Sequence, residues 1–256
     1  MTPPEDARLA ALAEEGDPQR AYVLRLAAPE AQDRLRALIA FDAELARIPI
    51  TVSEPMLGEI RLAWWREALE DLFERGAARG HEALQALAAT KDAAGWDRAL
   101  LDGMIDARAL SLGGLPIDEA ACGDFVEKTG AAFQRLAVAA LGDRSEKAAE
   151  VAALVGWAEG AARLADAFRA EAAAQEGAGE MAEVAERLAA EGRRRLSLAR
   201  SRRRDVAWEA RAPLCSVLLA EFMLAPAAAP ASEGRGGEWT VGARLRLAFR
   251  LGLRRF

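Results

Sequence analysis

The feature that most constrains this chain is its hydrophobic period. Apolar residues recur every three to four positions along nearly the whole chain, and no strand-like alternation extends beyond a few residues. Leu35, Leu38, Ile39 and Leu45 illustrate the pattern, since all fall on one helical face. Alanine is abundant and β-branched residues are scarce, which favours helix over strand. We therefore predict a single all-α domain, a helical bundle of roughly eight to ten helices.

Proline and glycine divide this pattern into helices. Pro49 and Pro55 predict a break over residues 47–53, because each restricts the residue before it. A helix capped by Ser53 follows, and its predicted buried stripe is Met56, Ile60, Trp64, Ala68 and Leu72. His81 is predicted to lie exposed at a helix start. Further helices are predicted at about 93–112, 117–141, 144–171, 178–204 and 211–224.

The composition changes after residue 224. We predict a helical domain over residues 1–224, a linker rich in proline, alanine and glycine over 225–238, and a basic amphipathic segment over 239–256. If that last segment is helical, Trp239 and Phe249 belong to its apolar part, whereas Arg246, Arg250 and Arg254 form a ridge at i, i+4 spacing. Two alternatives follow, since the segment either docks on the helical domain or contacts an anionic membrane or a partner groove.

Charge and cysteine content exclude several classes of protein. The net charge is −6, and an acidic chain is a poor general nucleic-acid binder. The cysteines, Cys122 and Cys215, lie too far apart in sequence for a metal motif or a disulfide framework, which indicates a reducing compartment. No signal peptide is visible, and prolines interrupt the longest apolar stretch. We expect a cytoplasmic protein, with a peripheral position at the inner membrane as the open alternative.

An ordered series of segments resembles the squalene/phytoene synthase family over about residues 18–224. They are Ala40-Phe-Asp-Ala-Glu-Leu-Ala, Val52-Ser-Glu, Arg61-Leu-Ala-Trp-Trp-Arg-Glu, Leu101-Leu-Asp-Gly-Met-Ile-Asp-Ala-Arg, Asp124-Phe-Val-Glu-Lys-Thr-Gly and Gly156-Trp-Ala-Glu-Gly-Ala-Ala-Arg-Leu-Ala-Asp-Ala. The resemblance implies an isoprenoid-synthase-like helical fold. It also implies, for active members, the joining of two prenyl diphosphates, with Mg²⁺ held by acidic clusters on two facing helices.

The chain departs from the family pattern at both acidic clusters. Where the first cluster is expected, the sequence reads Ala46-Arg-Ile-Pro-Ile50 and offers no carboxylate. The nearest acids, Asp42 and Glu44, are two residues apart and so diverge on a helix. At the second cluster Arg163 stands where the family has a polar amide, and Asp166 is a lone acid. We therefore predict no metal site and no cofactor, with Mg²⁺ relevant only if the chain is an active enzyme.

The loss of both clusters resembles one branch of the family, which contains the mitochondrial respiratory complex I assembly factor and its bacterial relatives. That resemblance implies a catalytically degenerate assembly or binding factor, whose protein partner is a respiratory-complex subunit. An active prenyl-diphosphate transferase and a lipid- or prenyl-binding protein stay open as alternatives. No catalytic residue is predicted. The candidate residues of a vestigial cavity are Phe41, Glu44, Arg47, Arg66, Asp102, Asp106, Arg163 and Asp166, and those of a membrane or partner surface are Trp239, Arg246, Phe249, Arg250 and Arg254.

Overall fold

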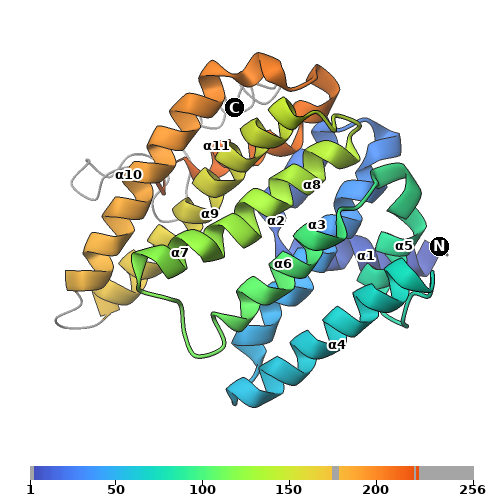
Figure 1. The fold of residues 1–256 in the computed structure, drawn as a ribbon, viewed down its shortest axis with the longest axis horizontal. Coiled ribbons are helices and arrows are strands. Elements are labelled where there is room, and N and C mark those ends of the chain that lie inside the picture. The colour runs from blue at the N-terminus through green and yellow to red at the C-terminus, as the bar shows by residue number, and fades with distance from the viewer. Residues whose placement is uncertain (1–2, 175–178, 222, 225–256) are drawn as a thin grey trace.

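Helices make up the regular structure of the residues that the computed structural model describes, namely 3–174, 179–221 and 223–224 (Figure 1). The all-α prediction is confirmed: apart from one isolated bridge, no strand pairing occurs in these ranges. The α-helices run over Pro3–Gly16 (α1), Pro18–Val23 (α2), Pro29–Thr51 (α3), Pro55–Glu74 (α4), Glu82–Ala94 (α5), Arg98–Ala109 (α6), Glu119–Val126 (α7), Ala132–Ala140 (α8), Glu146–Ala174 (α9), Gly179–Ser201 (α10) and Val217–Ala220 (α11). A π-helical turn, Glu127–Ala131, joins α7 to α8.

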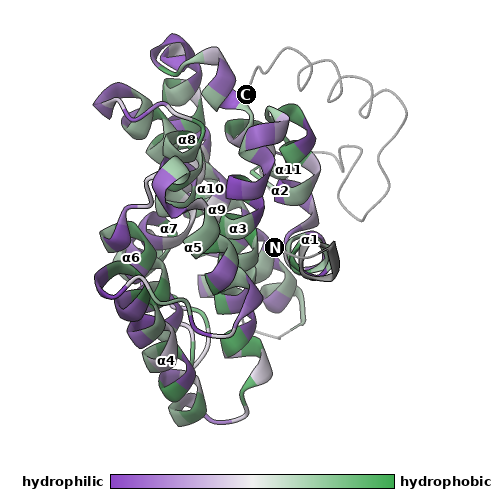
Figure 2. Ribbon diagram, turned by 90° about the vertical axis from the view of Figure 1, so that its right-hand side faces the viewer, coloured by the Kyte–Doolittle hydropathy of each residue, from purple (hydrophilic) through white to green (hydrophobic). Residues whose placement is uncertain are grey.

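Two hydrophobic cores meet in the middle of the molecule. The first contains Phe41 and Leu69 and is built by α1, α3, α4, α5, α6 and α8. The second contains Trp157 and Phe168 and is built largely by α7, α9 and α10. Short bands of hydrophobic and hydrophilic residues alternate along α4 and α6 in Figure 2, as expected of helices that bury one side. The long helices α3 and α9 belong to different cores, and residues of both line one cavity.

The predicted break over residues 47–53 is wrong in its first half. Helix α3 continues through Pro49 to Thr51 and breaks only at Val52. A proline lacks the N–H group that bonds to the fourth preceding carbonyl, but one missing bond in the last turn is tolerated. The hydroxyl of Thr51 donates to the carbonyl oxygen of Arg47 at 2.9 Å and satisfies one of the carbonyl groups at this end.

Four other predictions need correction. Helix α4 has Glu54, and not Ser53, at its N-cap position. The helix predicted over 93–112 begins only at Arg98, because Gly95 adopts a φ of 63° and caps α5. Where one helix was predicted over 211–224, residues 208–220 form two 3₁₀ turns and the short α11. In the predicted buried stripe of α4, Ala68 and Leu72 are buried, whereas Met56 and Ile60 are exposed. The stripe follows the helical period, yet no described residue covers its first two turns.

The backbones of the π-helical turn and α9 touch at two glycines. A Cβ atom on Gly130 would overlap the carbonyl oxygen of Gly156, and one on Gly156 would overlap that of Gly130. Any larger residue would force the two segments apart. The predicted linker and basic segment, residues 225–256, lie outside the described residues. Within the described part of the chain, no helix combines the length and hydropathy needed to cross a bilayer.

Candidate functional site

A cavity of about 520 Å³ is lined by residues of both α3 and α9. One side of it is apolar, with Pro49 and Ile50 from α3 and Leu164 from α9. Gly130 and the segment between α6 and α7 contribute further wall. The other side is charged, and the charged side chains that line it are Asp17, Arg20, Asp42, Arg108 and Arg163. These two sides define the central cavity, whose lining includes Ala46, Ile50 and Arg163 from the two positions where the resemblance implies acidic clusters.

Arg20, from the short helix α2, is the centre of the charged side. Its Nη1 atom donates to Asp42 Oδ2 at 2.6 Å, and its Nε atom donates to Glu159 Oε1 at 2.9 Å. The guanidinium group also lies 3.6 Å from the ring centroid of Phe133, a favourable cation–π position. Only 6% of this side chain is exposed, so the arginine links α3 to α9 through the interior.

Glu159 is fully buried on α9, and its carboxylate has four donors. Arg20 and Arg163 donate to Oε1, while Gln134 and Ser216 donate to Oε2 at 2.8 Å. Burial alone would raise the pKa of Glu159, but the charges of the two arginines and these hydrogen bonds outweigh it and lower the pKa to about 2. The carboxylate therefore stays ionised, and both of its oxygens already have partners.

Two further ion pairs complete the network around the cavity. Arg108 donates to Asp42 Oδ1 at 2.8 Å, and Arg163 lies 3.0 Å from Asp17 Oδ2. Burial would raise the pKa of Asp42, but Arg108 and Arg20 lower it. Asp17 also caps α2, because its side chain accepts from the backbone N–H of Arg20. Three arginines and three carboxylates thus balance one another in what we call the inner charge network: Asp17, Arg20, Asp42, Arg108, Glu159 and Arg163.

The donor set of the central cavity does not fit the Mg²⁺ ions that the family resemblance implies. Mg²⁺ requires carboxylate or water oxygens in near-octahedral array. Asp42 and Glu159 are each paired with two guanidinium groups, and Ala46 offers only a methyl group. In the described part of the chain, no three His, Cys, Asp or Glu side chains gather closely enough to hold a metal ion. We therefore derive no metal-dependent step at this site.

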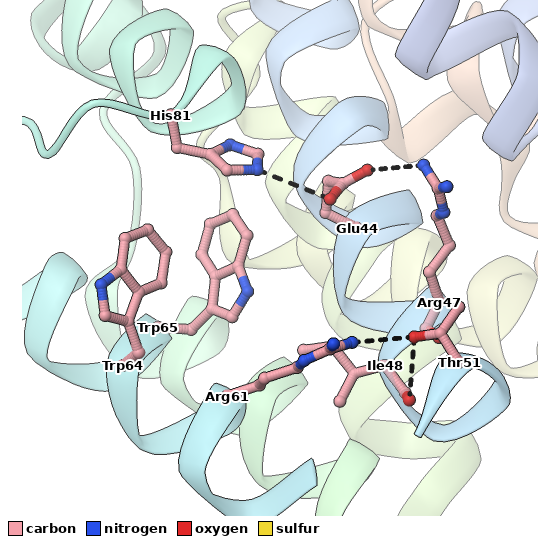
Figure 3. Close-up of a pocket in the computed structure, with 8 residues that line it drawn as sticks. All are labelled: Glu44, Arg47, Ile48, Thr51, Arg61, Trp64, Trp65 and His81. Carbon is pink, nitrogen blue, oxygen red and sulfur yellow. Dashed lines mark hydrogen bonds and ion pairs between the residues drawn. The ribbon is translucent and has the colours of Figure 1, made fainter. Parts of the chain in front are cut away.

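Helix α3 directs Asp42 and Glu44 to opposite sides, as their spacing predicts. Asp42 faces the central cavity, whereas Glu44 lines a second pocket of about 390 Å³ between α3, α4 and the start of α5. Figure 3 shows this outer pocket, with His81, Glu44 and Arg47 along its upper side and Trp64, Trp65 and Arg61 across from them. Arg47 and Arg163 therefore line two different cavities and not a shared site.

In the outer pocket Glu44 has two cationic or polar partners. Arg47 donates to its Oε1 at 3.1 Å, and His81 Nε2 lies 3.5 Å from its Oε2. The hydrogen bond from His81 lowers the pKa of Glu44 and, together with the positive charge of Arg47, outweighs partial burial. His81 also caps α5, because its Nδ1 accepts from the backbone N–H of Ala83. The histidine thus lies at a helix start as predicted, but it is half-buried rather than exposed.

The structure does not bring the eight predicted cavity residues together. Arg163 lines the central cavity, and Glu44 and Arg47 line the outer pocket. Phe41 is buried in the first core, where its ring meets that of Trp65 edge-on. Arg66 and Asp106 form an ion pair with each other near the surface, and Asp102 pairs there with Arg98. Asp166 is exposed on α9. The predicted surface residues Trp239, Arg246, Phe249, Arg250 and Arg254 lie outside the described residues.

Sequence reasoning missed most of the inner charge network. Arg20, Asp42, Arg108 and Glu159 were assigned no role there, and Asp42 was weighed only as an acid near the first cluster. One signal was available: Glu159 and Arg163 stand at i, i+4 within residues 151–165 of an alanine-rich helix, where every other residue is apolar or glycine. Gln134 gives a second signal, since it lies on α8, where the other polar residue is Arg135.

The fold and this cavity are those of a helical synthase-like protein, and the chain belongs to the squalene/phytoene synthase family. The model of that family, described as squalene/phytoene synthase, matches residues 13–163, which include α3 and most of the helix that carries Glu159 and Arg163. A more particular similarity covers a shorter segment. Over 53 residues the chain is 43% identical to a protein of Rattus norvegicus described as NADH dehydrogenase (ubiquinone) complex I, assembly factor 6. The match spans 20% of this chain and only 16% of the rat protein.

Proposed function

We propose that this protein is a non-catalytic member of its family that acts as an assembly or binding factor for a respiratory complex. One observation carries the proposal. At the place where the resemblance implies metal-bound diphosphate, the carboxylates Asp42 and Glu159 are held by arginines instead. A carboxylate that is paired inside the protein exchanges its partner only at a cost of several kcal/mol.

The similarity to the rat assembly factor supports the choice of process. The similarity is confined to 53 residues and does not identify a partner, so we propose the partner separately. We expect a protein subunit of respiratory complex I as the partner and no nucleic acid, because the chain is acidic. Peripheral contact with an anionic membrane through residues 239–256 is part of the same proposal, with a cytoplasmic position next to the inner membrane.

The test combines genetics with an enzyme assay. Deletion of the gene in its own host is expected to lower the amount of assembled complex I, measured by native electrophoresis with in-gel NADH dehydrogenase staining. The full chain on a plasmid should restore it. Purified protein incubated with farnesyl or geranylgeranyl diphosphate and Mg²⁺ is expected to release no diphosphate above background. Unchanged complex I after deletion, or metal-dependent diphosphate release, contradicts the proposal and favours the prenyl-transferase alternative.

A lipid- or prenyl-binding role is a second candidate, because the central cavity keeps an apolar side. Ile50, Leu115 and Leu164 line it, and its volume of about 520 Å³ falls in the range of ligand pockets. Native mass spectrometry of the purified full chain decides this point. A retained hydrophobic ligand of defined mass supports binding, whereas a spectrum with the bare chain alone contradicts it.

A further inference from the structure

The first two turns of α4 and the end of α3 present large hydrophobic side chains to solvent. Ile50 is 82% exposed, Met56 69%, Ile60 59% and Leu57 47%. A single exposed hydrophobic side chain is ordinary, but several that adjoin one another mark a contact surface. We call Ile50, Met56, Leu57, Ile60, Arg61 and Trp64 the corner surface, because they surround the bend between α3 and α4.

The part of the corner surface that α4 contributes is one continuous helical face and not a scatter of side chains. Met56, Ile60 and Trp64 follow one another at i, i+4 spacing, and Leu57 and Arg61 form the adjacent row. The first row continues into Ala68 and Leu72, which are buried in the first core. The same stripe is therefore covered by the protein at one end of α4 and, among the described residues, left open at the other.

The outer pocket adjoins this face and supplies positive charge. Glu44 already pairs with Arg47 and His81, whereas the hydrogen bond of Arg61 within the described structure goes to the hydroxyl of Thr51 at 3.0 Å. The two arginines and one carboxylate of the pocket leave one positive charge in excess, on a chain whose net charge is −6. Glu59, the nearest acid on α4, falls outside this face of the helix.

We propose that the corner surface and the outer pocket bind an amphipathic segment of a partner protein, with hydrophobic side chains over Met56, Leu57 and Ile60 and one carboxylate paired with Arg61. The combination of tryptophan and arginine within a hydrophobic rim is typical of the residues that dominate protein–protein binding. A segment without an acid would bury Arg61 without a partner, which is unfavourable. The proposal rests on the proposed function, because that function supplies the protein partner.

Photo-crosslinking in the native host tests this proposal. The full chain carries p-benzoylphenylalanine at position 60, and a matched control carries it at position 198, where Leu198 is exposed on α10. Position 60 is expected to give a covalent adduct, in which mass spectrometry maps an Asp or Glu close to the attachment point. The substitution Arg61→Glu is expected to lower the adduct yield about tenfold, because like charges then face each other. Replacing the mapped acid of the partner by arginine should restore the yield.

Each other result overturns the proposal. No adduct at position 60, or equal yield with Arg61→Glu, means that the corner surface does not bind an acidic segment. An adduct between two copies of this chain, with dimers in light scattering, makes the surface a self-association site. Cosedimentation with vesicles of phosphatidylcholine and cardiolipin that is lost in Met56→Ser/Ile60→Ser makes it a membrane contact. Thermal unfolding should show that these exposed substitutions leave the fold intact.

Complementation separates this proposal from the proposed function. If the chain restores complex I and the Arg61→Glu variant restores it equally, the surface is not the docking site, while the assembly role stands. If deletion never affects complex I, the assembly role fails, and the crosslinking result still decides whether the corner surface binds an acidic segment of some protein.

Discussion

The two faces of α3 both carry an acid paired with arginine, but the pairs are buried on one face and partly exposed on the other. On the inner face Asp42 belongs to a network in which Arg20 is 6% and Glu159 0% exposed. On the outer face, two residues along, Glu44 is 20% and its partner Arg47 is 59% exposed. The comparison teaches that pairing alone does not define a binding site. Breaking an ion pair of a buried network destabilises the fold strongly, whereas a partly exposed ion pair can exchange one partner for a ligand at a small cost in free energy.

Removal of Glu159 is expected to have the largest effect. In Glu159→Ala, Arg20 and Arg163 lose a shared carboxylate in the interior, and the free energy of unfolding should fall by about 3–5 kcal/mol. Asp166→Ala is the matched control, since Asp166 is exposed on the same helix, and it should stay within about 0.5 kcal/mol of the wild type. Urea unfolding followed by circular dichroism measures both. Equal effects of the two substitutions would mean that the buried ion pairs of Glu159 stabilise the fold no more than an exposed acid does.

The loss of stability at acidic pH should depend on the same residue, Glu159. The pKa of Glu159 is about 2 in the folded chain against 4.5 for an ordinary glutamate, so the unfolded chain binds the proton first as the pH falls. Its contribution of about 3 kcal/mol is present above pH 4.5 and is lost as the pH falls toward 2. Unfolding measured across this interval in wild type and in Glu159→Gln should show a shallower decline in the variant. Parallel curves would contradict the assigned pKa.

On the outer face, His81 should matter chiefly as a cap. His81→Ala removes the acceptor for the backbone N–H of Ala83 and should lower the free energy of unfolding by about 1 kcal/mol. His81→Asn retains a capping oxygen and should recover most of that loss. Thermal unfolding of the three proteins at pH 8 decides the point. If Asn is no better than Ala, the contacts of the imidazole ring with Trp64 and Trp65 are the larger contribution.

The smallest expected effect is that of Glu44→Gln. Its pairs with Arg47 and His81 are partly exposed, so the loss should be about 0.5 kcal/mol at low salt and should shrink in 1 M NaCl. The deficit of Glu159→Gln should change much less with salt, because buried pairs are screened less. Urea titrations at both salt concentrations test this contrast. If the stability loss in Glu44→Gln did not change with salt, the ion pairs of the outer pocket would behave like those of the inner charge network.

The sequence predicts the helices well because their signals are local. Hydrophobic period, capping residues and proline or glycine breaks all act within a few residues, and the all-α fold follows from them. The ends of helices were less predictable, as Pro49 shows, since one missing hydrogen bond in a last turn is offset by neighbours such as Thr51. The exposed half of the α4 stripe was also out of reach, because periodicity reveals an apolar face and not what covers it.

The inner charge network could be predicted only in part, because its contacts are distant in sequence. Arg20 and Glu159 are 139 residues apart, and Arg20 lies on a six-residue helix without any strong motif. The absence of carboxylates at Ala46 and Ile50 was visible in the sequence, and both residues line the central cavity. What the sequence could not show is that the remaining acids are neutralised by arginines from other helices.

The contact between Gly130 and Gly156 determines how this protein could be re-engineered. Gly130 lines the central cavity, and Gly156 precedes Glu159 by less than one turn of α9. The two backbones meet here without room for a Cβ atom, so this contact helps to set the spacing of the cavity walls. A single added methyl group, Gly130→Ala, would push these walls apart and move Glu159 relative to Gln134. Cavity size and charge pairing are therefore coupled, and a designer who widens this protein for a bulkier molecule must rebuild its salt bridges as well.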